Sequence, residues 1–413
     1  MINSNKETSL LRELAKQYAE IASQPVNTER KQRATGINSL RPARPIVWIH
    51  EIPWHEMDID GQLLLHCTDP KAREMEWFFR SSLFRWKYFQ ADMVAEPFYT
   101  VNKSWSTTGV GIEAQEEVRV TDNRNNIISH SYGDQLDTEE KLEALRNPIL
   151  SADKAADEAN VAFAREILGD ILPVKLRGSI IYYAPWDRIS RYRGVEPILI
   201  DILDRPEFIH ATMKRFTEFG LSTIDQMEKL DLLEYDSADL HCTPAWVDDL
   251  PAPDYDGGHI RLKDVWLRSM AQMFSSASPA MQEEFDVEYL KPLAEKCGLV
   301  YYGCCEPLHD RLDMLKKIPN MRKIGVSSWA DVERSAEEIG GGYVYSRKPN
   351  PAMVAGTVDE DAVRRETRET VEACLKHGCP YELVLKDIST VGSKPENLIL
   401  WNKLVQETID EYY

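Results

Sequence analysis

The chain of 413 residues is long enough for a large core, and its composition, with 43% hydrophobic and 28% charged residues, excludes a disordered protein. Its formal net charge is −19, from 68 acidic against 49 basic residues, which argues against broad binding to nucleic acid or to an anionic membrane. The N-terminus has no apolar segment preceded by basic residues, and no later stretch approaches the ~20 apolar residues that span a bilayer, so we expect a cytoplasmic protein. The seven cysteines are an odd number and two of them are adjacent, so we interpret them as reduced thiols.

The first 70 residues predict a helical arm and a connector. Apolar side chains recur on one face of a helix over residues 8–23, namely Leu10, Leu11, Leu14, Tyr18 and Ile21. A basic, proline-containing connector follows over residues 30–44. We expect this arm to dock on a main body that begins near residue 71.

The segment PIVWIHEIPWHEM, which follows the connector, is dense in histidine and glutamate. His50 and His55 lack the i, i+4 spacing of a zinc-binding helix, and Pro53 would interrupt such a helix. We therefore interpret this segment as a surface loop or a loop at the mouth of a substrate site.

Residues 71–150 combine an aromatic-rich helix with an insertion. The helix is expected over residues 71–88, and the sequence FQADMVAEPF after it predicts a strand that ends at Glu96. Residues 100–150 are rich in Thr, Gly and Asn, and we interpret them as an insertion packed against the main body.

From residue 176 onward, candidate strands alternate with helical patterns, which is typical of a parallel sheet. The predicted strands cover residues 179–183, 231–235, 299–302, 323–327, 343–345 and 382–385. With the strand before Glu96, they supply seven of the eight strands of a closed barrel. The sequence therefore predicts an α/β fold, a (β/α)8 TIM barrel over residues 71–413 with an N-terminal helical extension.

A second insertion, over residues 236–263, is too long for a routine barrel loop and predicts a lid or a binding loop. Two of its residues, His241 and Cys242, are chemically plausible metal ligands. The alternative is that both are solvent-facing loop residues.

The stretch GLVYYGCCEPLHD, residues 298–310, combines a buried strand with reactive side chains. Cys304, Cys305 and Glu306 follow the predicted strand directly, and the carboxyl ends of barrel strands carry the chemistry. Thiolates and carboxylates are ligands that Zn²⁺ accepts, so these residues are candidate metal ligands. The alternative is that one thiol packs as a small hydrophobic side chain.

Aromatic and basic residues near the predicted strand ends indicate a substrate pocket. Its candidate aromatic lining is Tyr182, Tyr183, Trp186 and Tyr302. Because strand residues alternate sides, half of such rings are ordinary core in the alternative interpretation. Arg347 is a candidate to bind an acidic group of the substrate, or else it pairs with a nearby Asp or Glu.

Three segments resemble the uroporphyrinogen decarboxylase-like superfamily, which contains porphyrinogen decarboxylases and zinc-dependent methyltransferases that work with corrinoid proteins. WDRISRYRGVEPILIDILDRPEFI, residues 186–209, resembles its Arg-Gly pair before an acidic helix entry. MFSSASPAMQEEFDVEYLKPL, residues 273–293, resembles its Ser-Pro run into a Tyr-Leu-Lys helix. SKPENLILWNKLV, residues 393–405, resembles its closing Pro-x-Glu-Asn helix start. The resemblance covers roughly residues 75–410 and implies the barrel fold.

The resemblance to the corrinoid-linked methyltransferases also implies a metal site at two strand ends. In those enzymes one strand ends in His-x-Cys, and a second Cys lies shortly before Pro-x-Glu-Asn. Here Gly303 and Cys305 fall on the first motif and Asp387 falls on the second, so the histidine and one thiol are replaced. The implied ligands are Cys305 and Asp387, and the set is completed by one of Cys304, Glu306 or Glu96. Glu306 and Glu96 are also the candidate catalytic carboxylates.

The sequence thus predicts a methyltransferase that uses Zn²⁺ or another divalent metal and passes a methyl group from a small methylated compound to a corrinoid protein. An oxygen-richer metal site suits an O-methyl donor, and Arg347 suits an acidic one. No Asp-x-His-x-x-Gly signature of a cobalamin module occurs, so cobalamin would arrive on the partner protein. The oligomeric state stays open, with a homodimer as one option.

Two alternatives remain. A uroporphyrinogen decarboxylase would need several cations for its substrate carboxylates, and no arginine lies between Arg44 and Arg73, where that enzyme has its signature arginines. A non-catalytic barrel that serves as a binding protein is the other, because a fold does not fix a function.

Overall fold

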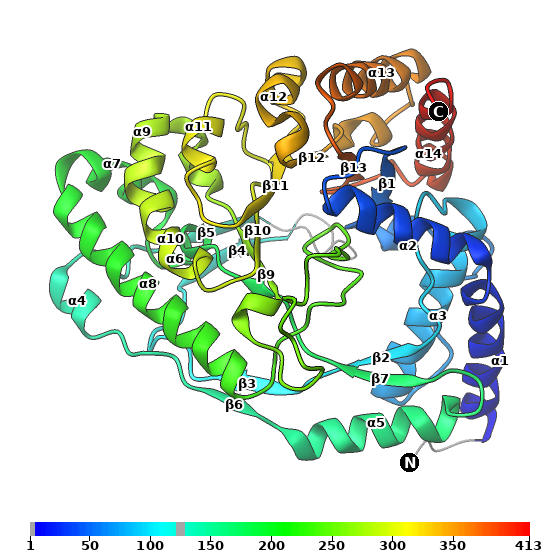
Figure 1. Ribbon diagram of the computed structural model, residues 1–413. Helices are drawn as coiled ribbons and strands as arrows, with labels where there is room; N and C mark the ends of the chain where they lie inside the picture. Colours follow the sequence, from blue (N-terminus) through cyan, green and yellow to red (C-terminus); the bar gives the residue numbers. More distant parts are fainter. Residues whose placement is uncertain (1–4, 121–128) are drawn as a thin grey trace.

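The computed structural model describes residues 5–120 and 129–413, and its centre is a seven-stranded parallel sheet (Figure 1). The strands run in the order β1, β13, β12, β11, β10, β9, β8. Their bounds are β1 (Ile46–Ile49), β8 (Ile181–Tyr182), β9 (Trp266–Ser269), β10 (Leu299–Tyr302), β11 (Met321–Val326), β12 (Val344–Arg347) and β13 (Tyr381–Leu385). Every residue of β1, β9, β10, β12 and β13 is buried, as expected for a parallel sheet that is covered on both faces.

Helices follow most of these strands and lie on the outside of the curved sheet (Figure 1). α8 packs against α10, and α13 packs against both α12 and α14. α8 buries a face of Phe, Ile and Met side chains spaced by three and four residues, which is why it docks as an amphipathic helix. The helices of this layer are α6 (Pro185–Arg193), α7 (Val195–Asp204), α8 (Pro206–Lys229), α9 (Pro279–Gln282), α10 (Glu288–Ala294), α11 (Leu312–Leu315), α12 (Val332–Ile339), α13 (Glu360–His377) and α14 (Pro395–Asp410).

The sheet is not the closed eight-stranded barrel that the sequence predicts. Among the described residues, no strand ladder joins β1 to β8. Next to β1, the N–H of Asp92 donates to the carbonyl of Val47, and further along the chain β2 (Tyr99–Asn102) pairs in parallel with β7 (Val174–Arg177). A mixed α/β fold with a barrel-like parallel sheet is therefore what the structure shows.

Two of the predicted strands are corrected. The strand expected to end at Glu96 is absent there, because the chain turns at Ala91, whose φ is 46°, and the extended chain begins at β2 instead. The strand expected over residues 231–235 is reduced to one bridge between Ser179 and Leu233. Conversely, β1 lies within the segment interpreted as a loop, and β9 was not predicted.

The N-terminal residues join the main body through two helices and a strand. α1 (Asn5–Ala22) packs against α3 (Pro70–Tyr88) and α5 (Lys154–Leu168), whereas α2 (Pro25–Asn38) packs against β1. β1 lies inside the 1–70 range that was assigned to an arm, yet it pairs in register with β13 of the central sheet.

The insertion over residues 100–150 contains short antiparallel pairs. They are β3 (Trp105–Thr107) with β6 (Leu150–Ala152) and β4 (Glu116–Arg119) with β5 (Ser129–Tyr132), and α4 (Glu139–Glu143) lies between β5 and β6 in the chain. Residues 121–128 of this predicted insertion lie outside the described residues. Within the described part of the chain, no helix is long and apolar enough to cross a membrane.

The long loop after α8 enters the space enclosed by the strands. The Thr243 hydroxyl donates to Glu382 of β13 at 2.7 Å, and the indole of Trp266 in β9 donates to the carbonyl of Ala245 at 2.8 Å. Trp246 packs edge-on against Trp48 of β1. The middle of the predicted lid thus packs inside the curved sheet, because its apolar side chains complete the core where the sheet stays open.

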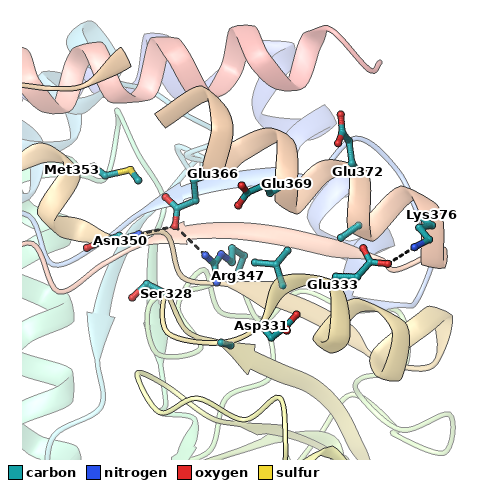
Figure 2. Close-up of a pocket in the computed structure, with 13 residues that line it drawn as sticks. Ser328, Asp331, Glu333, Arg347, Asn350, Met353, Glu366, Glu369, Glu372 and Lys376 are labelled. Atoms are coloured by element: carbon teal, nitrogen blue, oxygen red, sulfur yellow. Dashed lines mark hydrogen bonds and ion pairs between the residues drawn. The ribbon is translucent and has the colours of Figure 1, made fainter. Parts of the chain in front are cut away.

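The end of β12 shows how side chains alternate between the interior and the helix layer. Ser346 points inward, where its hydroxyl donates to Glu382 at 2.5 Å. Arg347 points outward to Glu366 of α13, with a nitrogen–oxygen distance of 3.0 Å (Figure 2). Lys348 points inward again and contacts Ser346. This period of two places Arg347 away from the sheet interior.

Candidate functional site

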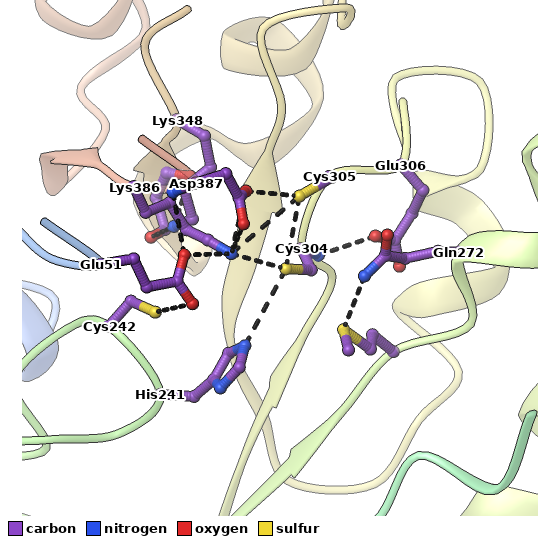
Figure 3. A network of polar contacts seen from close by, with 12 residues as sticks. Glu51, His241, Cys242, Gln272, Cys304, Cys305, Glu306, Lys348, Lys386 and Asp387 are labelled. Atoms are coloured by element: carbon purple, nitrogen blue, oxygen red, sulfur yellow. Dashed lines mark hydrogen bonds and ion pairs between the residues drawn. The ribbon is translucent and has the colours of Figure 1, made fainter. Parts of the chain in front are cut away.

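Four chain segments bring reactive side chains together at the carboxyl ends of the strands (Figure 3). β10 leads to Cys304 and Cys305, β13 leads to Lys386 and Asp387, and β1 leads to His50 and Glu51. The loop that fills the sheet interior contributes His241 and Cys242. The carboxyl ends of parallel strands are where α/β proteins of this kind build their sites.

Cys305 and Asp387, which the sequence placed at two strand ends, lie in contact. The Cys305 thiol donates to Asp387 Oδ2 at 2.8 Å, and the sulfur atoms of Cys305 and Cys304 are 3.6 Å apart. His241 Nε2 lies 3.9 Å from Cys304 Sγ. The two adjacent thiols therefore sit between a carboxylate and an imidazole.

Lys386 is the cation of this cluster, and it was not among the residues predicted from the sequence. Its Nζ lies 3.1 Å from Cys304 Sγ, 3.1 Å from Asp387 Oδ2 and 3.6 Å from Glu51 Oε2. Burial opposes its charge, but the neighbouring thiols and Asp387 raise the pKa of Lys386 above its usual range. Its only sequence signal was a lysine next to Asp387 at a strand end.

The same contacts act on the thiols. The contact with Cys305, the contact with His241 and the Lys386 ammonium lower the pKa of Cys304, against the effect of burial. The hydrogen bond to Cys304 and burial raise the pKa of Cys305. These contacts thus favour the thiolate form at Cys304 over that at Cys305.

A group of three potential metal ligands lies beside this cluster. One ligand atom each of His50, Glu51 and Cys242 can be chosen so that all lie within 4.8 Å of one another. Within the described residues, no such group includes the predicted ligands Cys304, Cys305 or Asp387. The ammonium of Lys386 contacts all three of those side chains and also lies 3.6 Å from Glu51, so it competes with a metal for ligands of both sets.

The donor set of this group fits a metal such as zinc. Imidazole nitrogen, carboxylate oxygen and thiolate sulfur are all zinc ligands. His50 Nδ1 is buried without a hydrogen-bond partner, and Cys242 Sγ lies 3.5 Å from Glu51 Oε1. Burial lowers the pKa of His50, which favours the neutral imidazole that metal binding requires. His50 and Glu51, from the segment PIVWIHEIPWHEM that was interpreted as a loop, thus combine with Cys242 of the long loop into a site. The sequence of neither segment predicts this site alone.

Backbone strain is concentrated in this cluster. Glu51, His241, Cys242 and Asp387 are four of the ten non-glycine residues with positive φ in the described chain, with values of 49°, 53°, 72° and 56°. Such conformations are costly for residues with a side chain, and they persist where the surrounding structure holds them, often at functional sites. The strain points to a role for these four side chains.

Gly303 explains why a histidine cannot occupy the first position of the implied motif. Its φ is 100°, and a Cβ atom there would lie 2.5 Å from Leu308 Cδ1 and 3.2 Å from the backbone nitrogen of Gly325. β10 and β11 approach each other closely at this point, so only glycine fits without rearrangement.

The two candidate catalytic carboxylates lie in different places. Glu306 is buried and accepts the N–H of Cys304 at 2.8 Å and the N–H of Ala271 at 3.3 Å, so it fixes the turn that carries the thiols. Burial raises its pKa. Glu96 is not brought to this cluster, because it forms an ion pair with Arg177 at 2.8 Å.

The predicted aromatic lining is divided between site and core. The ring centroid of Tyr182 lies 5.4 Å from that of His241, so Tyr182 borders the cluster. Trp186 is fully buried against Phe274, and the hydroxyl of Tyr302 donates to buried Asp286 at 2.6 Å. The structure also places Tyr183 in the core, against Gly220 of α8, as expected when strand residues alternate sides.

A cavity of about 430 Å³ adjoins the thiols and is formed by the ends of β11, β12 and β13. Its polar floor contains Cys305, Lys348, Lys386 and Asp387. Proline and alanine side chains form one wall, and Trp329 stands at its edge with 77% of its surface exposed. Arg347 does not line this cavity.

Comparisons with known proteins give a likeness in fold. No protein-family model matches the chain, and no curated protein matches it in sequence. A solved structure of a methyltransferase from Methanosarcina mazei matches over 93% of this chain and 99% of its own, with a TM-score of 0.50 and 12% sequence identity. At that identity, the two proteins share a fold.

Proposed function

We propose that the protein is a metal-dependent methyltransferase that moves a methyl group from a small methylated compound to a corrinoid protein. The observation that carries this proposal is the His50, Glu51 and Cys242 group at the carboxyl ends of the strands, next to paired thiols and a cavity. The fold likeness to a methyltransferase supports the same reaction class. In this proposal, the parallel sheet together with residues 92–102 is a variant of the (β/α)8 barrel.

His50, Glu51 and Cys242 are the residues that would hold the metal. A bound divalent metal supplies Lewis acidity, which polarises the oxygen of an ether or alcohol donor. In this proposal, the mixed nitrogen, oxygen and sulfur donors suit an O-methyl donor better than a thiol substrate.

The remaining polar residues have positioning and charge-balancing roles. Lys386 links the carboxylates of Glu51 and Asp387 to Cys304, so it holds the three strand ends in a fixed relation. Cys305, less buried than Cys304 and part of the cavity floor, is the thiol that faces a bound substrate. Burial of the floor and the apolar wall exclude water from the reacting methyl group.

The experiment is a methyl-transfer assay with the purified, zinc-loaded protein. A panel of methylated compounds is offered with reduced cobalamin as acceptor, and methylcobalamin is measured by its absorbance. We expect transfer from at least one donor, its loss in Cys242→Ser, and its retention in Cys374→Ala, whose thiol lies on the buried face of α13. If the zinc-loaded wild-type protein methylates cobalamin no faster than the Cys242→Ser variant with any of the donors, the proposal is contradicted. That outcome favours the non-catalytic barrel.

A further inference from the structure

One buried lysine in the interior of the sheet, Lys348, forms no ion pair among the described residues. Lys323 Nζ lies 2.9 Å from both oxygens of Glu382, and both side chains are fully buried. Lys386 is paired with Asp387 and Glu51. Lys348 is 5% exposed, and among the described residues its ammonium hydrogen-bonds the hydroxyl and the carbonyl of Ser346 but forms no ion pair.

The other neighbours of Lys348 do not supply a full counter-ion. The oxygens of Glu382 already accept hydrogen bonds from Lys323, Thr243 and Ser346. The ring of Tyr301, 5.4 Å from the Lys348 ammonium, offers a π-face and no net charge. A buried ammonium without a carboxylate partner is costly, so a position of this kind calls for an anion from outside the chain.

The cavity next to the thiols gives that anion a place. Lys348 lies on its floor, beside Lys386 and Asp387 (Figure 3). Pro349, Pro351 and the exposed indole of Trp329 provide apolar and aromatic surface along the same cavity. A ligand that fits both parts has a charged end and an apolar body.

The neighbouring charges limit the charge of the ligand. Asp387 and Glu51 lie beside the cavity floor and repel a multiply charged group such as phosphate. A single ammonium without an ion-pair partner matches a ligand with a single negative charge. A monocarboxylate meets this condition, and its apolar body can pack on the indole of Trp329.

We propose that Lys348 binds the carboxylate of the substrate in this cavity, with the apolar part of the molecule against Trp329. The sequence suggested Arg347 for that role, but the structure turns Arg347 outward to Glu366. The identification of this cavity as a substrate site rests on the proposed function. The inference adds that the substrate is a methylated monocarboxylic acid.

The test uses para-fluorobenzoate as an anionic probe and para-fluorobenzamide as its neutral counterpart. Binding of each to the full-length, metal-free protein is followed by fluorine NMR, without corrinoid or methyl donor. We expect the anionic probe to bind about tenfold or more tightly than the neutral one, and this preference to disappear in Lys348→Met. Arg347→Met, one residue away and outside the cavity, is expected to keep the preference.

Further variants make the outcome decisive. Trp329→Ala is expected to weaken both probes while keeping the preference for the anion, because the indole contacts the apolar body and not the charge. Circular dichroism confirms that each variant is folded, and Lys348→Ala serves if Lys348→Met does not fold. Equal affinity for the two probes in the wild-type protein, or an unchanged preference in a folded Lys348 variant, overturns the inference and leaves Lys348 as a structural residue.

The test is independent of the methyl-transfer assay. If para-fluorobenzoate binds through Lys348 but no methyl transfer occurs, the proposed function fails and the anion site stands. If methyl transfer occurs without an anion preference, the proposed function stands and the inference fails.

Discussion

Lys386 places its ammonium nitrogen 3.1 Å from the sulfur of Cys304, and each of the two residues is only 3% exposed. At such burial, a positive charge in contact with a thiol stabilises the thiolate much more than it would in water. This relationship links two strand ends that are far apart in the sequence, and it makes Lys386 one of the groups that set the protonation of the site.

The first prediction follows from that contact. In the metal-free protein, the contacts with Cys305 and His241 and the Lys386 ammonium together lower the pKa of Cys304. Removing the cation with Lys386→Met raises that pKa, so less thiolate is present at neutral pH. The thiolate absorbance in the ultraviolet, followed during a pH titration, should show its low-pH step shifted to higher pH in Lys386→Met and lost in Cys304→Ser.

Cys374→Ala is the matched control for this titration. Burial raises the pKa of Cys374, so its thiol stays protonated at neutral pH and its removal leaves the low-pH step unchanged. A Lys386→Met titration that overlays the wild-type curve would show that the ammonium does not hold the thiolate.

The second prediction separates the two candidate ligand sets. If His50, Glu51 and Cys242 hold the metal, His50→Ala and Cys242→Ser should lose zinc through gel filtration, while Cys305→Ala should retain most of it. The ligand set expected from the sequence predicts the reverse for Cys305. Metal content measured by plasma mass spectrometry decides between the two sets. Loss of zinc in Cys305→Ala alone would place the metal on the thiol pair and Asp387.

Local patterns predicted the strand that carries the thiols but not the full set of their neighbours. The run Leu299–Tyr302 is apolar and aromatic, and β10 has these bounds because such a run favours a buried strand. The contact between Cys305 and Asp387 follows from two strand ends on one edge of a parallel sheet. Both inferences needed only short-range pattern and general topology.

The rest depends on the path of the chain in three dimensions. His50 and Glu51 follow β1, whose apolar run Ile46–Ile49 resembles that of β10 but was included in the predicted loop together with the residues after it. Cys242 reaches them because the loop after α8 fills the sheet interior, which no local signal encodes. Lys348 points into the sheet interior and Arg347 points to the helix layer. A shift of one residue at the end of β12 would exchange these two directions.

The third prediction concerns Arg347. Its guanidinium pairs with Glu366 in a nearly solvent-free position between β12 and α13, so Arg347→Met leaves a buried carboxylate without its partner. We expect the free energy of unfolding in urea to fall by about 3 kcal/mol. Methyl transfer by the folded variant should stay at the wild-type level. If the variant is as stable as the wild type and has a raised KM for an acidic donor, Arg347 binds the substrate instead.

The last prediction concerns Asp286, which lies beneath β10. It accepts the Tyr302 hydroxyl at 2.6 Å on Oδ2, whereas its Oδ1 is buried without a partner. Burial raises the pKa of Asp286 from 3.8 to about 7. Between those values the folded protein holds this proton and the unfolded chain does not, so the stability contributed by this group falls as the pH rises.

The free energy lost across that window is up to about 4 kcal/mol, from about 1.4 kcal/mol per pKa unit. Asp286→Asn keeps a hydrogen-bond acceptor for Tyr302 but does not titrate. We therefore expect its unfolding free energy in urea, relative to the wild type, to increase between about pH 5 and pH 8. Asp313→Asn is the control, because Asp313 is 96% exposed and should give a profile parallel to the wild type. Parallel profiles for Asp286→Asn and the wild type would mean that Asp286 is ionised in the folded protein at neutral pH, and that Tyr302 stabilises its charge despite the burial.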